Sequence, residues 1–203
     1  MLATMLIAGF GALISIIIAI VALLVGLKNG SAKLIGLTRP KSWPMTILLG
    51  VVIGVALQMI FNILLDPLFE LMTGSQLDLS NVDKVQGDFP RYLLWLGIGW
   101  IFGGFLEELS FRGYIITRIR FLLGGNAVGT TVAILASAIP FGMAHMYQDW
   151  AGVLSAGAMG ICFAILFIGS RYNLWLLMLV HGFANTTDLT LIYLDLQRAF
   201  RLF

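Results

Sequence analysis

Two adjacent glutamates, Glu107 and Glu108, follow an uncharged apolar run in the middle of the chain. The only two histidines, His145 and His181, lie downstream, each inside another apolar run. A lipid-exposed acid at the bilayer centre costs about 2.5–3.5 kcal/mol on insertion scales, so such groups are usually paired, hydrated or functional. Carboxylates and imidazoles are common general acids and bases, which makes these four residues the first candidates for chemistry.

The two glutamates differ in what their neighbours in sequence offer them. Glu108 precedes Arg112 by four residues, which is the favourable order for an ion pair on one face of a helix. Glu107 projects about 100° away round an α-helix and has no cation at a matching spacing. We therefore expect Glu108 to brace the structure through Arg112, and Glu107 to serve as a general base.

The segments around the histidines carry two further signals. Pro140 has no backbone donor, so we expect it to kink its helix and to free a carbonyl just before His145. His181 and Asn185 are four residues apart and share one helical face, with Asp188 roughly in line. We interpret Asp188 as an interfacial acid near the end of the last helix.

The depth of these groups can be compared from the helical rise. A rise of about 1.5 Å per residue places His181 roughly 12 Å from the cytoplasmic helix ends, and Asn185 and Glu107 roughly 18 Å. His145 falls at roughly 28 Å on the same count. Convergence of all four residues therefore requires helix tilt or the kink at Pro140.

The composition indicates an integral membrane protein. Of the 203 residues, 60% are hydrophobic and 11% are charged, whereas soluble domains carry about 25% charged residues. The net charge of +2 and the lack of a basic cluster argue against binding to nucleic acid. Cys162 is the only cysteine, which excludes an internal disulfide and a cysteine-based structural zinc site.

The expected fold is all-α: a polytopic transmembrane bundle of about six spanning helices with a polar intramembrane cavity. A span needs about 20 mostly apolar residues. By this measure we predict helices at residues 4–27, 45–69, 92–119, 127–147, 150–170 and 173–194. The third helix either continues through the glutamates or breaks near Gly103 and Gly104.

The organisation along the chain is simple. Residues 1–72 form an N-terminal helix pair, residues 73–91 form a polar loop, and residues 92–194 form the core that carries the candidate site. Residues 1–27 hold no charge and lack the basic start of a signal peptide, so we expect them to form a retained first span.

Charged residues in the short connections predict the orientation. Connections 28–42 and 118–126 are basic, and Arg171 precedes the last helix, whereas the 73–91 loop mixes two cations with acids. Because basic connections stay in the cytoplasm, the N-terminus is expected outside, although Arg198 and Arg201 in the tail disagree. We predict a multi-pass protein of the cell membrane.

Three segments resemble motifs of a known family. EELSFR at 107–112, FGMAH at 141–145 and HGFAN at 181–185 are similar to the motifs EExxxR, FxxxH and HxxxN. In this order they mark the CAAX-protease and bacteriocin-processing family (CPBP, also called Abi). The resemblance covers about residues 92–194 and uses both histidines. The family includes the type II CAAX prenyl endopeptidases, so the resemblance implies a glutamate-dependent intramembrane protease.

Carried over by motif position, the resemblance implies a role for each catalytic candidate. Glu107 would activate the attacking water, and His145 would help to hold and polarise it. His181 and Asn185 would stabilise the oxyanion that forms on the scissile carbonyl.

The resemblance also implies the setting of the reaction. Glu108 and Arg112 would support the site, and Phe141 would pack beside it. The implied cavity is reachable from the cytoplasm, and the implied substrates are CAAX-type lipidated peptides, leader peptides or bacteriocin-like peptides. The partners are therefore the bilayer and a peptide or lipidated peptide, and not a nucleic acid.

A zinc-dependent protease is the alternative chemistry. Glu107, His145 and His181 would then be the metal ligands. The HExxH spacing is absent, and Asn185 is a poor zinc ligand but a good hydrogen-bond donor. We favour hydrolysis without a metal or another cofactor.

Two non-enzymatic alternatives use the same polar pocket. A membrane immunity or binding protein would capture its partner there, but capture alone does not need an acid, imidazoles and an amide together. A small transporter is disfavoured because the sequence shows no inverted repeat and no matching pair of broken helices.

Overall fold

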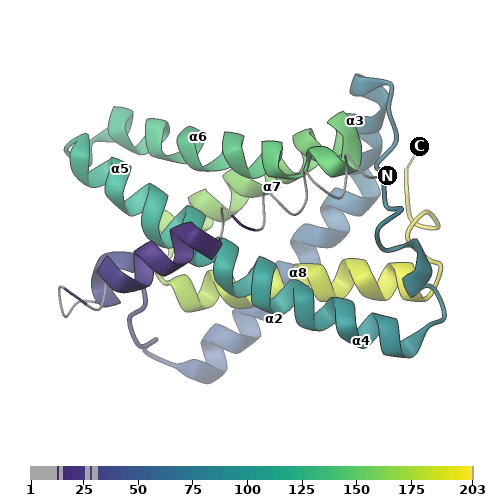
Figure 1. Ribbon diagram of the computed structural model, residues 1–203, viewed down its shortest axis with the longest axis horizontal. Coiled ribbons are helices and arrows are strands. Elements are labelled where there is room, and N and C mark those ends of the chain that lie inside the picture. The colour runs from purple at the N-terminus through teal and green to yellow at the C-terminus, as the bar shows by residue number, and fades with distance from the viewer. Residues whose placement is uncertain (1–12, 14–15, 26–27, 29–31, 203) are drawn as a thin grey trace.

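The computed structural model describes residue 13, residues 16–25, residue 28 and residues 32–202, and within these ranges the chain is helical without strands (Figure 1). The α-helices and the long π-helix are α2 (Trp43–Ile60), α3 (Asp66–Thr73), α4 (Phe89–Ile98), η4 (Gly99–Ile116), α5 (Thr117–Leu122), α6 (Ala127–Ala144), α7 (Asp149–Gly169) and α8 (Leu174–Tyr193). A short π-helix, η2 (Phe61–Leu65), joins α2 to α3, and 3₁₀ turns occupy Ala32–Ile35, Asp83–Val85 and Met146–Gln148.

The predicted spans correspond to these elements with small shifts at their ends. The span predicted at 45–69 is the continuous run Trp43–Thr73, and the span predicted at 92–119 is the run Phe89–Leu122. The first predicted span, 4–27, lies largely outside the described residues, but its described part Ile16–Val25 is helical. The all-helical membrane bundle of about six helices is confirmed.

Side-chain caps explain why several helices begin where they do. Ser42, Asp88, Asn126 and Asn173 accept hydrogen bonds from backbone amides in the first turns of α2, α4, α6 and α8. Such residues are favoured at this position because they satisfy amides that lack a partner within the helix. The termini of the helices therefore follow from local sequence.

Helix α8 lies at the centre of the bundle and packs along α2 and η4 (Figure 1). Gly50 and Gly54 of α2 permit the first contact: a Cβ atom at Gly50 would lie 2.5 Å from the Leu179 Cβ, and one at Gly54 would lie 2.5 Å from the Val180 carbonyl oxygen. Small residues at four-residue spacing thus allow the two helices to approach closely at this interface. Helix α2 and the candidate core share one packed interior.

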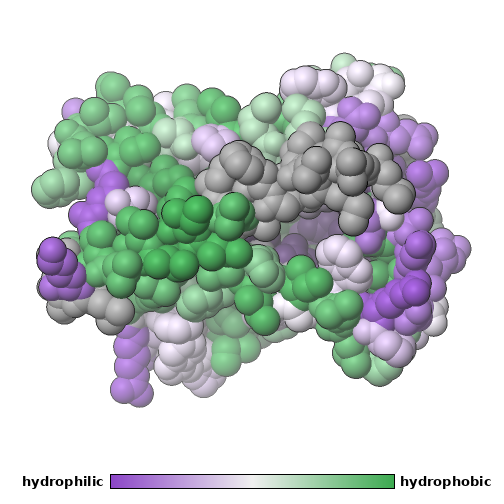
Figure 2. Space-filling model, viewed as in Figure 1, coloured by the Kyte–Doolittle hydropathy of each residue, from purple (hydrophilic) through white to green (hydrophobic). Residues whose placement is uncertain are grey.

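Four described helical runs are long and apolar enough to cross a membrane: Trp43–Thr73, Phe89–Leu122, Ala127–Ala144 and Met146–Gly169. Helix α8 is not among them, because its polar side chains lower its hydropathy. Figure 2 shows hydrophobic residues over much of the visible surface, most of the hydrophilic ones at the end where Figure 1 places the 74–88 connection and the C-terminal tail, and smaller hydrophilic groups at the opposite end. A polar central helix enclosed by apolar ones can place charged chemistry within a membrane.

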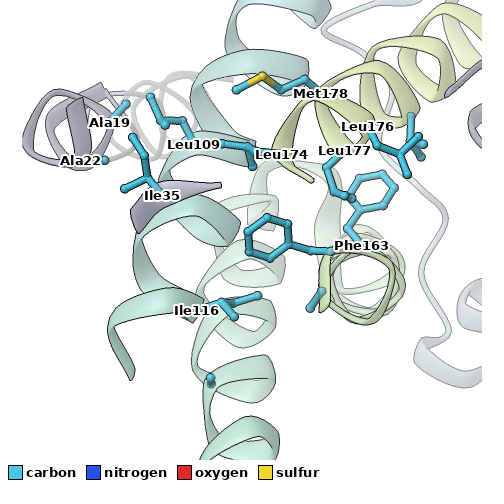
Figure 3. Close-up of a cluster of buried hydrophobic side chains, with 14 residues drawn as sticks. Ala19, Ala22, Ile35, Leu109, Ile116, Phe163, Leu174, Leu176, Leu177 and Met178 are labelled. Carbon is cyan, nitrogen blue, oxygen red and sulfur yellow. The ribbon is translucent and has the colours of Figure 1, made fainter. Parts of the chain in front are cut away.

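An apolar cluster fixes the positions of the helices that carry the site. Phe163 of α7, Leu109 of η4 and Leu177 of α8 are fully buried in it (Figure 3). Ile35 and Ala19 contribute to the same cluster from the described N-terminal part. Because such cores are packed as densely as organic crystals, the three site-bearing elements have little freedom to move apart.

Candidate active site

The two glutamates lie within a helix that does not break. The run Phe89–Leu122 continues through them, and its portion Gly99–Ile116 is the π-helix η4. Of the two forms predicted for this span, the continuous one is present. π-Helical turns, in which hydrogen bonds join residues five apart, are rare and frequently occur at functional sites.

Glu108 is fully buried and holds two partners with one oxygen. Its Oε1 accepts a hydrogen bond from Arg112 Nη1 at 2.9 Å and lies 2.8 Å from His181 Nδ1. The ion pair predicted from the four-residue spacing is thus present. The contact with His181 was not predicted: Glu108 also orients a histidine that lies 73 residues away in sequence.

Arg112 is enclosed by aromatic rings as well as by its ion pair. Its guanidinium carbon lies 4.5 Å from the centre of the Phe141 ring and 5.2 Å from that of Phe163. Its Nη2 donates to the Gly160 carbonyl at 3.2 Å. A buried charge is tolerable only with such partners, so this enclosure compensates the burial of Arg112 and Glu108.

Glu107 occupies the open side of the same helix. About 20% of its side chain is exposed, compared with 0% for Glu108. Its Oε2 lies 3.9 Å from His181 Nε2, which is too far for a direct hydrogen bond. His181 therefore stands between the two glutamates, with one ring nitrogen toward each.

Asn185 lies beside the open face of His181. Its Nδ2 donates to the Gly99 carbonyl at 2.9 Å, which uses one of the two amide hydrogens. A Cβ atom at Gly103 would collide with Asn185 Nδ2 and would lie 3.1 Å from His181 Nε2. The missing side chain at Gly103 thus lets both groups reach the surface of η4 next to Glu107.

His145 ends α6 and is held by its own helix. Its Nδ1 lies 2.8 Å from the Phe141 carbonyl, so Nδ1 must carry the hydrogen and Nε2 remains an acceptor in the neutral ring. We predicted a carbonyl freed by Pro140. The carbonyl is instead that of Phe141, which is available because α6 ends at Ala144 and continues through Pro140 without interruption.

The structure brings most, but not all, of the candidates into direct contact. Glu107, Glu108, His181 and Asn185 meet between η4 and α8. His145 has neither a hydrogen bond nor an ion pair to Glu107, both being described residues, and its ring lies 4.9 Å from that of Phe141. The depth difference predicted for His145 is consistent with this separation.

No group of three or more His, Cys, Asp and Glu side chains in the described part of the chain is arranged to hold a metal ion. The three ligands considered for zinc, Glu107, His145 and His181, are therefore not gathered as a coordination set. Asp188 lies on α8 beyond Asn185 and faces a different group of polar residues.

Two contributors to this site were missed by sequence reasoning. Phe163 of α7 packs against both Arg112 and His181, with its ring 4.9 Å from that of His181. Tyr147 stacks near His145 at 5.6 Å between rings. A phenylalanine in an apolar helix carries no signal of its own, whereas a tyrosine two residues after a candidate histidine could have been considered.

The site thus combines a buried ion pair with an exposed acid beside a histidine and an amide, groups that can act as a general base and as hydrogen-bond donors. Residues 89–187 match the family model described as "Type II CAAX prenyl endopeptidase Rce1-like". This part of the chain is similar to that family, as the three motifs indicated, and the similarity points to a membrane protease of the CAAX type in general. Comparisons with curated proteins and with solved structures give no match.

Proposed function

We propose that the protein is an intramembrane endopeptidase in which Glu107 activates water without a metal ion. The observation that carries the proposal is the different surroundings of the two glutamates: Glu108 is buried against Arg112 and His181, whereas Glu107 is partly exposed. A general base must reach its water, and only Glu107 is placed to do so.

The separation of Glu107 from His181 suits a shared water molecule. At 3.9 Å the carboxylate oxygen and Nε2 do not bond directly, yet one water can lie within hydrogen-bond distance of both. Glu107 takes a proton from this water as the oxygen attacks the scissile carbonyl carbon. Glu107 then gives that proton to the leaving nitrogen as the C–N bond breaks.

Negative charge on the carbonyl oxygen needs donors that are already in position. The second amide hydrogen of Asn185 is free to donate, because the first is held by Gly99. With both ring nitrogens protonated, His181 donates to Glu108 through Nδ1 and to the oxyanion through Nε2. Removing one such donor typically lowers kcat about 10²–10³-fold.

His145 is assigned a role at a distance from the attacking water. Its Nε2 is left as an acceptor, because Nδ1 is bonded to the Phe141 carbonyl. We propose that His145 approaches the water only when the substrate is bound, since catalytic hydrogen bonds are often long in the free enzyme.

The substrate class follows from the family description. We propose that the chain cleaves prenylated C-terminal CAAX peptides, in which the lipid is attached to the cysteine. A lipidated peptide partitions into the bilayer, which brings its scissile bond to a site within the membrane. The predicted orientation opens this site toward the cytoplasm.

The test uses the purified protein in lipid vesicles with matched peptides that carry or lack a prenyl group. Wild type is expected to cleave the prenylated peptide, while Glu107→Gln, nearly identical in shape, loses about 10²–10⁴-fold in kcat. Asp88→Asn, a partly exposed acid at the start of α4 whose cap an asparagine can also form, is the matched control and retains full activity.

The outcomes separate the parts of the proposal. Retained turnover by Glu107→Gln overturns the assignment of the base. Equal cleavage of the unprenylated peptide overturns the substrate class and leaves the base unaffected. Biological function retained by Glu107→Gln without any cleavage would indicate a protein that only binds its partner.

A further inference from the structure

A second group of polar side chains lies inside the bundle, away from the candidate active site. Asp66 is buried at the start of α3, and its carboxylate accepts a hydrogen bond of 2.6 Å from Ser155 of α7. Asp188 of α8 is close enough to interact electrostatically with Asp66 and has the Gln58 side chain against it. Two acids, one at the start of α3 and one on α8, thus lie within electrostatic range of each other.

The positive charge of Arg201 does not compensate both Asp66 and Asp188. Arg201 of the C-terminal tail acts on Asp66 and Asp188, but its Nη1 is bonded to Glu70 Oε2 at 2.8 Å. Three carboxylates therefore share one guanidinium. An uncompensated buried acid requires hydrogen-bond donors in place of bulk water.

The side chain of Asn62 indicates which molecule supplies those donors. This side chain is fully buried, and neither its Nδ2 nor its Oδ1 has a hydrogen-bond partner among the residues that the structure describes. Gln58, Asn62 and Asp66 follow one another at four-residue spacing, and the first and last both interact with Asp188. This spacing places Asn62 between Gln58 and Asp66 on the same side of the helical run.

We propose that Asn62, Asp66 and Asp188 enclose an internal water-binding site. Buried polar groups almost always have a partner, and where no protein group serves, an ordered water usually does. An amide that lacks both a donor partner and an acceptor partner is satisfied by water, whereas a cation would satisfy only the oxygen. Among the described residues, no three His, Cys, Asp and Glu side chains are arranged to hold a metal ion.

This site lies between the polar end of the molecule and the active site. Gln197 donates to Asp188 Oδ1 at 3.5 Å and also lines a surface hollow of about 340 Å³ beside Asp83. On the other side, Tyr147 is close enough for the charges of both Asp188 and Glu107 to act on its hydroxyl group. Gln197 thus lies between the hollow and the cluster, and Tyr147 lies within electrostatic range of both the cluster and Glu107.

The second half of the inference rests on the proposed function: the internal waters replenish the water that Glu107 consumes. Each turnover uses one water molecule, and a lipidated substrate covers the open face of the site. A route from the opposite end allows water to reach Glu107 while the substrate is bound.

Two experiments test the two halves. A structure determined at a resolution that reveals ordered water is expected to show a water bonded to Asn62 and to one of the two aspartates. An amide bonded only to protein groups, or a cation at the centre of the cluster, would overturn the water site.

Steady-state cleavage tests the supply of water. Asn62→Leu, which removes the polar atoms at similar volume, is expected to lower kcat about tenfold with KM unchanged. Asn62→Ser, which still binds water, restores kcat and keeps the test valid if the leucine variant fails to fold. Thr46→Val, which removes a buried hydroxyl near the other end of α2, is the matched control and leaves kcat unchanged.

The results distinguish this inference from the proposed function. Wild type that is inactive on every peptide contradicts the proposed function, but waters observed at Asn62 still support the site. Active wild type together with an equally active Asn62→Leu overturns the supply of water alone.

Discussion

The site consists of a buried half and a solvent-exposed half, and the adjacent residues Glu108 and Glu107 lie one in each. We call these the closed half and the open half. In the closed half, Glu108 and Arg112 are fully buried, and Phe141 and Phe163 cover the guanidinium. In the open half, Glu107 and Asn185 are partly exposed on either side of His181 Nε2. A glutamate side chain thus stabilises the fold at position 108 and is available for chemistry at position 107. The direction in which each side chain leaves the helix decides between the two roles.

The largest expected effect is on the free energy of unfolding, and it tests the difference between the closed half and the open half. Glu108→Gln is expected to lower the free energy of unfolding by about 3–5 kcal/mol, because it leaves Arg112 buried without its counter-charge. Glu107→Gln is expected to change it by less than about 0.5 kcal/mol. Thermal unfolding in detergent compares the two, and equal losses would remove the distinction between the halves.

A second prediction concerns kcat and the open half alone. Asn185→Ala is expected to lower kcat about 10²–10³-fold, because the oxyanion loses one donor. Thr187→Ala on the same helix is the control, since its hydroxyl bonds only to the Phe183 carbonyl. A large rise in KM at constant kcat would instead assign Asn185 to substrate binding.

A smaller effect tests the close approach across η4. In Gly103→Ala the new methyl group displaces Asn185 and the Nε2 edge of His181, and we expect roughly a tenfold loss of kcat. Gly97→Ala, in the same helical run, meets nothing within 4 Å and is expected to be neutral. Equal activity of the two variants would contradict the positioning of these donors.

The smallest expected effect is that of a chelator. Hydrolysis by Glu107 and water needs no metal, so treatment with EDTA or phenanthroline is expected to leave the rate of cleavage unchanged. Loss of activity that returns with added zinc would show that Glu107, His145 and His181 gather around an ion when the protein is loaded.

The features that were predicted from sequence are those set by local spacing. The apolar runs gave the spans, and four residues between Glu108 and Arg112 gave the ion pair. The contact of Glu108 with His181 depends on how η4 and α8 pack against each other, and no spacing within one segment encodes it. The depths of the site residues, counted along straight helices, were too approximate to predict this contact.

Two other features were beyond sequence reasoning for distinct reasons. The π-helical stretch Gly99–Ile116 changes the direction of side chains relative to an α-helix, and the apolar pattern of the segment does not reveal it. The partner of His145 depends on where α6 ends, and the prediction placed that end at residue 147, whereas the helix stops at Ala144. Boundaries of helices are set by a few local hydrogen bonds, which hydropathy does not resolve.

The π-helix η4 makes the site sensitive to a kind of genetic change that its flanking loops would tolerate. A single-residue deletion between Gly99 and Glu107 would rotate the glutamates round the helix axis relative to α4, carrying Glu108 out of reach of His181. The same deletion in the 74–88 connection would only shorten a surface loop. Insertions and deletions in homologous chains should therefore avoid this stretch, even where individual residues within it vary.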